Sequence, residues 1–396
     1  MLLSARTIHP FPARMAPEIA LNAIPERRSA EQLLVIDPMC GSGTVLAAAV
    51  QRGQRALGID IDPLAVMMST VVTSPQNFAS LSELAQGAIS ASKQAKAHSP
   101  WIDDETERFA QYWFGKKQKY QLTVLAAAIK NIEDVHQRLA LQVALSRIIV
   151  TKSPQASLAA DTAHSRPHKV QQESDYDVFL GFEKSAQALG RLLEKRENLG
   201  SANVLLGDSR TLGGISDGCA DLAVTSPPYL NALDYLRGHK LALIWFGHSI
   251  PSLREIRRDS IGAERALDGP PDELGQDLAD MITDSVSEPD TLPKGMILRF
   301  AHDMVGFAKQ LRRVLKADGS VVVVVGNSTL KGNYIRNDLI TQTALEAMGF
   351  ALASRHEREI PPQKRYMAMS SRGADMALAK RMRSEVVLTM KGTARG

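Results

Sequence analysis

Four short segments carry the side chains that could do chemistry, and each follows a short apolar run. The first has the sequence DPMCGSGT over residues 37–44 and follows the apolar run 33–36. Its glycines would let the backbone approach a ligand closely, and the helix N-terminus that follows would present free amide groups. We therefore expect a ligand at this turn, although a tight strand-to-helix turn without a ligand would have the same sequence.

Two acidic residues follow further apolar runs. Asp60 ends the run 56–59, and its separation from the glycine turn, about 20 residues, is that of an acidic residue that binds the ribose of a nucleoside cofactor. Asp62 precedes Pro63, a pair typical of a helix N-cap and first turn. Asp208 follows the run 204–206 and could accept a hydrogen bond from an adenine amino group, although a simple turn would also explain it.

The sequence TSPPY over residues 225–229 is the most informative segment. Its adjacent prolines fix the backbone and leave carbonyl oxygens without nearby amide donors. Ser226 and the Pro227 carbonyl could then accept both hydrogens of one amino group, which would free the nitrogen lone pair for attack. Tyr229 could stack on a base taken out of its helix. The alternative is a structural Pro-Pro loop with a packed tyrosine.

Together, the segments DPMCGSGT and TSPPY resemble the motifs of the amino-methyltransferases that make N4-methylcytosine or N6-methyladenine, in particular those with SPPY. The segment HPFPAR over residues 9–14 also resembles the family's segment before the glycine turn. The resemblance implies S-adenosylmethionine as cofactor, DNA as partner and direct in-line methyl transfer without a covalent nucleophile. It implies that the residues of catalysis are Ser226, Pro227, Pro228 and Tyr229, and that those of cofactor binding are Phe11, Pro12, Asp37, Met39, Cys40, Gly41, Gly43, Thr44, Asp60 and Asp208.

The chain departs from the family pattern at three points. Met39 stands where the family commonly has phenylalanine, and a long insertion separates Asp60 from Asp208. Ser226, in place of the aspartate of other members, favours cytosine N4, although some adenine N6 enzymes share the serine. An enzyme that methylates an amino group of an RNA base, and a non-catalytic binder with a degenerate methyltransferase fold, remain as alternatives.

The order of apolar runs and helical patterns predicts an α/β fold, a doubly wound Rossmann-like sheet. We expect strands at 33–36, 56–59, 204–206, 222–224 and 321–325, and a C-terminal β-hairpin of 350–353 with 385–390. The catalytic domain would comprise residues 1–73 and 201–396, with a helical insertion at 74–200 that contains a polar, mobile stretch at 151–175. Either this insertion or residues 236–300 would recognise the target.

Three groups of basic residues could contact DNA phosphates. We prefer Arg254, Arg257 and Arg258, because they follow the TSPPY segment by one helix. The other two groups are Lys116, Lys117 and Lys119, and Lys364 and Arg365 with Tyr366. A solvated charged surface is the alternative for each group.

Composition restricts the class of protein. The 396 residues have a net charge of only +4 and 44% hydrophobic residues, which is ordinary for a globular protein. Two distant cysteines form no disulfide framework, and the nine histidines show no metal-ligand spacing. We expect no signal peptide, no membrane span and no metal, and a cytoplasmic location.

Overall fold

The predicted apolar runs form the strands of one sheet in the computed structural model. The model describes residues 8–10, 14–28, 30–94, 96, 98–194, 199–230, 234–263, 267, 269–270, 272–360 and 384–393. The sheet has seven strands in the order β10-β11-β7-β6-β1-β2-β5, and only β11 runs antiparallel to its neighbours. The strands are β1 (Leu34–Asp37), β2 (Arg55–Asp60), β5 (Ser201–Leu206), β6 (Ala220–Thr225), β7 (Leu315–Gly326), β10 (Phe350–Glu359) and β11 (Ser384–Gly392).

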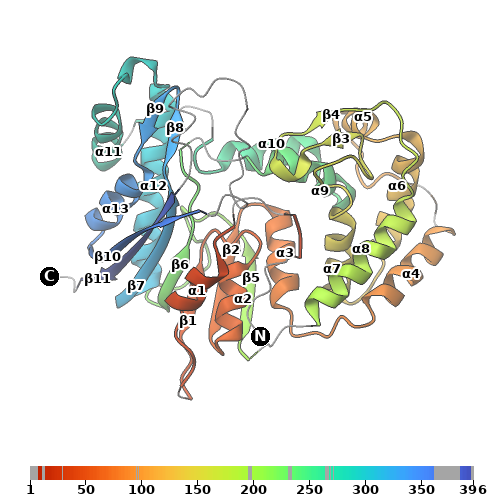
Figure 1. The fold of residues 1–396 in the computed structure, drawn as a ribbon, viewed down its shortest axis with the longest axis horizontal. Coiled ribbons are helices and arrows are strands. Elements are labelled where there is room, and N and C mark those ends of the chain that lie inside the picture. The colour runs from red at the N-terminus through yellow and green to blue at the C-terminus, as the bar shows by residue number, and fades with distance from the viewer. Residues whose placement is uncertain are drawn as a thin grey trace.

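Both faces of the sheet are buried, as parallel strands that are apolar on both sides require. In β1, Val35 belongs to the core on one face and Ile36 to the core on the other. Helices α1 (Pro17–Ala23) and α2 (Thr44–Gln51) cover the first face, and α11 (Glu273–Asp284), α12 (Lys294–Val314) and α13 (Asn337–Ala347) cover the second (Figure 1). The α/β, doubly wound fold class is therefore confirmed.

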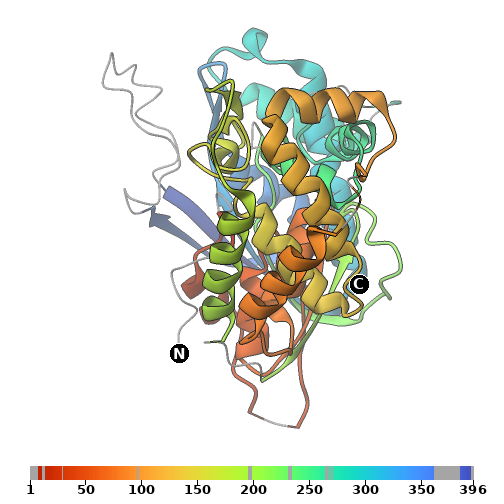
Figure 2. The same ribbon diagram turned by 90° about the vertical axis from the view of Figure 1, so that its right-hand side faces the viewer.

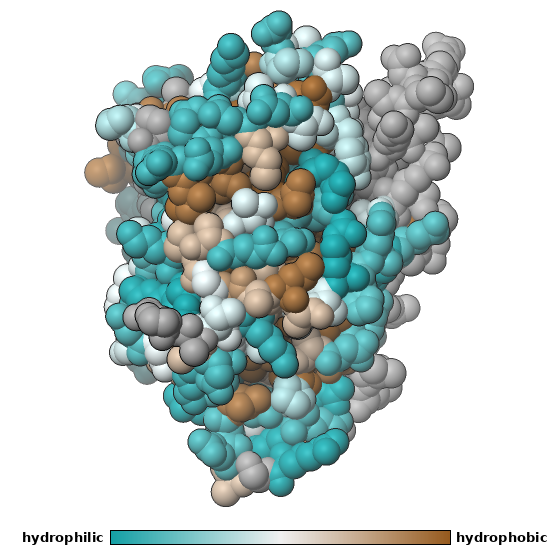
Figure 3. Space-filling model, turned by 90° about the vertical axis from the view of Figure 1, so that its left-hand side faces the viewer, coloured by the Kyte–Doolittle hydropathy of each residue, from teal (hydrophilic) through white to brown (hydrophobic). Residues whose placement is uncertain are grey.

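The outer side of the second helical layer faces solvent. Figure 3 shows this side, where apolar side chains lie in patches between hydrophilic ones rather than as one continuous surface.

The C-terminal β-hairpin is also confirmed, and it is longer than predicted. β10 pairs antiparallel with β11 from Phe350↔Gly392 to Glu359↔Ser384. β11 in turn pairs antiparallel with β7 from Glu385↔Gly326 to Lys391↔Ser320. The hairpin thus extends the sheet beyond β7.

The helical insertion forms a lobe of its own to the right of the sheet in Figure 1. Its helices are α4 (Leu81–Ser92), α5 (Asp104–Trp113), α6 (Lys116–Lys130), α7 (Val135–Ser146) and α8 (Val178–Leu193). They share a hydrophobic core with α3 (Pro63–Thr73), the helix that follows β2. Helix α3 contacts both the sheet strands β2 and β5 and the lobe helix α7, so it joins the two parts.

The polar stretch 151–175 is not the mobile segment that we expected. It contains the antiparallel pair β3 (Ala159–Ala160) and β4 (His168–Lys169), with the 3-10 turn η1 (Thr162–His164) between them. Ala156 and Leu158 are almost fully buried, and the Leu158 amide donates to the Trp113 carbonyl at 2.8 Å. These contacts hold the stretch against the lobe, which its high serine content concealed.

The second predicted insertion divides between the two parts of the molecule. Helices α9 (Leu236–Leu243), η2 (Ile244–Phe246) and α10 (Ile250–Asp259) pack into the core of the helical lobe, whereas α11 packs against the sheet. The short elements η3 (Pro289–Thr291), β8 (Ser328–Leu330) and β9 (Asn333–Ile335) complete the fold. Within the described residues, no helix has the length and apolar character of a membrane span.

Candidate active site

The glycine turn and the TSPPY segment lie at the same edge of the sheet, because each follows the carboxyl end of one of two neighbouring parallel strands. β1 pairs with β6 through Val35↔Leu222 and Ile36↔Ala223, so Asp37 ends β1 beside the last residues of β6. The strand order also reverses here, because the chain continues from β1 to β2 on one side and from β6 to β7 on the other. Open α/β sheets bind their ligands at such a position.

Asp60 organises the glycine turn through backbone amides. Its Oδ2 accepts from the Gly41 amide at 2.8 Å and its Oδ1 from the Asp62 amide at 2.9 Å. The Cys40 amide donates to the Ile59 carbonyl at 3.0 Å, which ties the turn to the end of β2. Each carboxylate oxygen keeps a further lone pair, so Asp60 can still accept from a ligand hydroxyl.

Gly43 must be glycine for two reasons. Its φ of 80° lies in the left-handed region, and an added Cβ would lie 2.6 Å from Val72 Cγ1 and 3.0 Å from Ser69 Cα. Helix α2 begins at the next residue, Thr44, with Gly43 as its N-cap. The glycine therefore lets the turn pack directly against α3.

Two carboxylates, the buried Asp37 and the partly buried Asp60, give this edge an unusual electrostatic character. Burial raises the pKa of Asp37 to about 7, and the Asp60 charge adds to the rise, against the opposing effects of the Thr225 hydroxyl and the Met39 amide. Burial, and then the charge of Asp62, raise the pKa of Asp60 to about 6. Two such acids favour a ligand that brings hydroxyl donors and positive charge.

The TSPPY corner presents two acceptors. Ser226 is exposed, and its hydroxyl donates to the Val324 carbonyl of β7 at 2.9 Å. Because the hydroxyl hydrogen is used in this way, the oxygen lone pairs are left to accept. Among the described residues, no group donates to the Pro227 carbonyl, and Pro228 has no amide of its own. Tyr229 is half-buried, and burial raises its pKa to about 12, so the phenol stays neutral.

Two residues that the sequence analysis did not identify hold the far end of this corner. The Leu230 amide donates to Asn337 Oδ1 at 3.1 Å, and the Ser328 hydroxyl donates to the Leu230 carbonyl at 2.7 Å. Asn337 Nδ2 donates to Ser328 Oγ at 2.9 Å and to the Gly326 carbonyl at 3.1 Å. Asn337 is almost fully buried and begins α13. No pattern in the sequence marked Asn337, because its partners come from distant parts of the chain.

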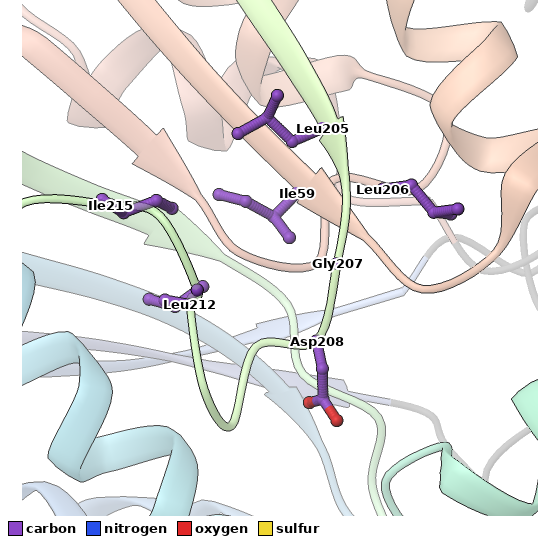
Figure 4. A pocket seen from close by; sticks show the side chains of 8 residues that line it. Ile59, Leu205, Leu206, Gly207, Asp208, Leu212 and Ile215 are labelled. Carbon is purple, nitrogen blue, oxygen red and sulfur yellow. The ribbon is translucent and has the colours of Figure 1, made fainter.

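Asp208 follows β5, as expected, but its carboxylate is bound by an arginine. Arg210 donates to Asp208 Oδ1 through its backbone amide at 2.8 Å and through Nε at 3.0 Å. Its Nη1 also donates to the buried Asp303 at 2.7 Å. Asp208 lies beside a cavity of about 280 Å³, and Figure 4 shows its carboxylate directed away from the apolar side chains of Ile59 and Leu205.

A buried histidine connects the end of β2 with α9. Asp62 is the predicted N-cap of α3, and its Oδ1 accepts from the Leu64 amide at 2.9 Å, which confirms that prediction. Its Oδ2 lies 2.5 Å from His239 Nδ1 on α9. The His9 ring packs edge-on against the His239 ring, with centroids 6.2 Å apart. The segment before the glycine turn therefore meets the helix after the TSPPY corner, which no local pattern in the sequence indicated.

Of the remaining predicted site residues, some lie within the glycine turn, some on α10, and others outside the described residues. Phe11 and Pro12 are outside the described residues, as are Lys364, Arg365 and Tyr366. Met39 is half-buried and Cys40 buried within the turn, and burial raises the pKa of the Cys40 thiol, so this cysteine is not a thiolate nucleophile.

The three preferred arginines lie on α10, and each faces a carboxylate of the protein. Arg254 pairs with Glu105, Arg257 with Asp234, and Arg258 with Glu255 at 3.1 Å. All three side chains are about half exposed, at 52%, 46% and 54%. Exposed pairs of this kind are weak, so the arginines remain candidates for phosphate contacts. Elsewhere in the described part of the chain, no cluster of three histidine, cysteine or acidic side chains could hold a metal ion.

Comparison with curated proteins finds two type II methyltransferases. No family model matches the chain. The chain is similar to the type II methyltransferase M.MvaI of Kocuria varians. The two are 22% identical over 97% of this chain and 90% of that protein. The chain is also similar to the type II methyltransferase M.BsoBI of Geobacillus stearothermophilus, with 26% identity over 61% of this chain. This match spans about half of that relative, 52% of its length. Among solved structures, a geranyl diphosphate methyltransferase in complex with GPP and sinefungin overlaps 95% of this chain and 78% of its own at 8% identity, with a TM-score of 0.35.

Proposed function

We propose that this protein is an S-adenosylmethionine-dependent DNA methyltransferase that modifies the exocyclic amine of a base, most specifically N4 of cytosine. The observation that carries the proposal is the Ser226 hydroxyl, whose hydrogen is donated to Val324 at the edge where the glycine turn also ends. The similarity to two type II methyltransferases supports DNA as the substrate. A role beside a restriction enzyme follows from the same similarity.

The residues at the glycine turn fit the cofactor. S-adenosylmethionine brings a positively charged sulfonium, which carries the transferable methyl group, together with an ammonium group and two ribose hydroxyls. Asp60 is placed to accept from the ribose, because its two oxygens already lie at the turn through the Gly41 and Asp62 amides. Asp37 is buried with no cation beside it in the described residues, so a cationic ligand would relieve a carboxylate that the protein leaves unpaired.

We propose that the adenine of the cofactor binds in the cavity beside Asp208. The apolar cavity lined by Ile59, Leu205 and Leu212 could receive a flat ring, and Asp208 lies at its border. Because Arg210 already donates to both carboxylate oxygens of Asp208, an adenine amine would share this acceptor with the arginine.

The corner performs the transfer by holding the amine. Ser226 Oγ accepts one amine hydrogen and the Pro227 carbonyl accepts the other, which turns the nitrogen lone pair out of the plane of the base. S-adenosylmethionine would supply the methyl group, its S–C bond breaking as the N–C bond forms, and the amine nitrogen would lose one proton to solvent. Tyr229 stacks on the base and keeps it out of the double helix. The protein supplies position and acceptors, and neither a nucleophile nor a strong base is needed.

The roles of the larger regions follow from this placement. We propose that residues 1–73 and 201–396 form the catalytic unit, and that the helical lobe, within residues 74–200, reads the target together with part of residues 236–300. Helices α9 and α10 support this because they leave the catalytic corner and enter the core of the lobe.

Replacing Ser226 tests whether its hydroxyl oxygen holds the target amine during methyl transfer. Ser226→Ala removes one charge-assisted acceptor, worth about 1.5–3 kcal/mol, so kcat for methyl transfer to DNA should fall about 10- to 100-fold. The affinity for S-adenosylmethionine, measured by calorimetry, should not change, because Ser226 is not part of the glycine turn.

Ser216→Ala is the matched control, since Ser216 is exposed in the loop between β5 and β6. Heterologous genomic DNA serves as substrate because it contains all short recognition sequences. Equal turnover by the native protein and Ser226→Ala would remove the proposed mechanism, and no transfer to DNA by the native protein would remove the proposed function.

A further inference from the structure

Besides the apolar cavity near Asp208, a second cavity, lined by polar side chains, lies where the N-terminal segment meets the helical lobe, away from the catalytic corner. Its volume is about 450 Å³, and its lining includes Pro10, Arg147, Gln155, Tyr176, Lys184 and Ser185. Arg147 follows α7, and Lys184 and Ser185 belong to α8. Figure 1 shows α7 and α8 side by side in the right-hand lobe, with α3 between them and the sheet.

Arg147 is a partly buried cation that faces no carboxylate among the described residues. Its Nε donates to Ser185 Oγ at 3.2 Å, and its Nη1 donates to the Ile8 carbonyl. Within the described chain, no carboxylate lies within 4.0 Å of this guanidinium, and burial alone lowers its pKa. A buried charge that is left unpaired costs several kcal/mol, by an order-of-magnitude estimate. A protein tolerates such a charge most readily where a ligand supplies the opposite one.

Two further groups of the cavity can donate to a ligand, the Lys184 ammonium group and the Gln155 amide nitrogen. Lys184 is exposed at the rim, and no described residue accepts a bond from its ammonium group. The Tyr176 hydroxyl donates to Gln155 Oε1 at 3.3 Å, which leaves the Gln155 amide nitrogen to donate elsewhere. Neither an aspartate nor a glutamate lines the cavity. This donor set suits an anion with several oxygen atoms.

The wall of the cavity is built closely. A Cβ on Gly181 would lie only 2.0 Å from the Tyr176 hydroxyl, so the glycine allows the tyrosine to lie against α8. The Ser185 hydroxyl donates to the Ala144 carbonyl at 2.7 Å, and it therefore meets Arg147 as an acceptor. These contacts fix the Arg147 guanidinium and the Tyr176 side chain before any ligand binds.

The position of the cavity connects it with the catalytic corner. Ile8 and Pro10 flank His9, which is fully buried and packs against His239 of α9. Helix α9 follows the TSPPY corner in the chain. The contact between the His9 and His239 rings therefore connects the cavity with the corner. In contrast, the exposed arginines of α10 already face carboxylates of the protein.

We propose that the cavity around Arg147 and Lys184 binds a backbone phosphate of the DNA substrate and so sets the position of the duplex on the helical lobe. This inference rests on the proposed function. The exposed rim at Lys184 favours a phosphate of a macromolecule over a small enclosed anion. A phosphate contact of this kind positions the duplex without reading its sequence.

The test measures the affinity of the protein for a DNA duplex at several salt concentrations. Lys184→Gln removes one phosphate contact, so the slope of log K against log salt should decrease in magnitude by about 0.9. Arg191→Gln is the matched control, because Arg191 is exposed on the same helix but does not line the cavity. Its slope should stay within about 0.3 of the native value. Arg147→Gln should weaken binding at least as much as Lys184→Gln, and thermal unfolding shows whether that variant is folded.

Several results would overturn the inference. If Lys184→Gln and Arg191→Gln change the slope equally, or if neither changes it, the cavity does not bind a backbone phosphate. Tight binding of inorganic phosphate, with no effect of Lys184→Gln on the duplex, would assign the cavity to a small anion instead. In both cases native binding and methylation of DNA would leave the proposed function intact. A native protein that binds no duplex at all would contradict the proposed function and this site together.

Discussion

Asp37, at the end of β1, is buried without a cation beside it in the described structure, and this gives the folded protein a measurable pH dependence. Burial raises the pKa of Asp37 to about 7, whereas the unfolded chain titrates near 3.9. Between about pH 4 and pH 7 the folded state therefore holds a proton that the unfolded state has lost. The free energy of unfolding must fall across this window and level off above it.

Asp37→Asn should remove the part of the pH dependence that comes from Asp37, whereas the part that comes from Asp60, whose pKa is raised to about 6, should remain. Between pH 5 and pH 7 the native protein should lose about 2 kcal/mol of unfolding free energy through this group, an order-of-magnitude value, and the variant should not. Urea denaturation at pH 5, 7 and 8 measures the difference. Asp318→Asn is the control, since Asp318 is exposed in β7. A native-like pH profile in Asp37→Asn would show that Asp37 is not the titrating group.

At the scale of the elements, the packing of the glycine turn on α3 can be separated from its backbone strain. Gly43 and Gly214 have similar φ values, 80° and 76°. An added Cβ at Gly43 would meet Val72 at 2.6 Å, whereas one at Gly214 would meet nothing within 4 Å. Any alanine at either position carries the strain of the left-handed region, about 1–2 kcal/mol.

Gly43→Ala should therefore cost more than Gly214→Ala. We expect a loss of about 2–4 kcal/mol for Gly43→Ala and about 1 kcal/mol for Gly214→Ala, because overpacking adds to the strain only at Gly43. Chemical denaturation measures both losses, and titration with S-adenosylmethionine should show weaker binding only for Gly43→Ala. Equal losses in the two variants would mean that the turn can move away from α3.

Much of the sheet could be predicted from the sequence because its strands are short apolar runs that end at polar residues. The runs before Asp37, Asp60 and Asp208 all became parallel strands, and their ends meet at one edge. The prediction for β7 was too short, because the strand begins at Leu315 with polar residues that no apolar pattern marks. The prediction of a mobile stretch at 151–175 was wrong for a related reason. This stretch packs through a few small residues within a polar sequence.

The supports of the candidate site could not be predicted, because they come from distant parts of the chain. Leu230 and Asn337 are 107 residues apart and Asp62 and His239 are 177 apart. The pairing of Asp208 with Arg210 could not be predicted for the same reason. Arg210 is near in sequence, but Asp303, which also accepts from Arg210, comes from α12. Local patterns thus indicate the candidate groups for ligand binding, whereas the tertiary structure determines what holds them.

At the scale of the whole molecule, the proposed catalytic edge of the sheet lies beside a helical lobe, and the chain crosses between the two parts more than once. Figure 2 shows the lobe from its outer side, with α4, α6, α7 and α8 in front of the sheet. Helix α3 leaves the glycine-turn side and α9 leaves the TSPPY corner, and both enter the core of the lobe. A base bound at Ser226 and a duplex bound on the lobe would therefore be positioned by one continuous body.

The central claim is that this body transfers a methyl group to an exocyclic amine of a DNA base. The most direct measurement is mass spectrometry of nucleosides from heterologous genomic DNA and from RNA, each incubated with the native protein and labelled S-adenosylmethionine. We predict labelled N4-methylcytosine in DNA and none in RNA. Labelled N6-methyladenine would keep the mechanism and change the base. Label in RNA alone, or label on a ring carbon instead of an amine, would contradict the account.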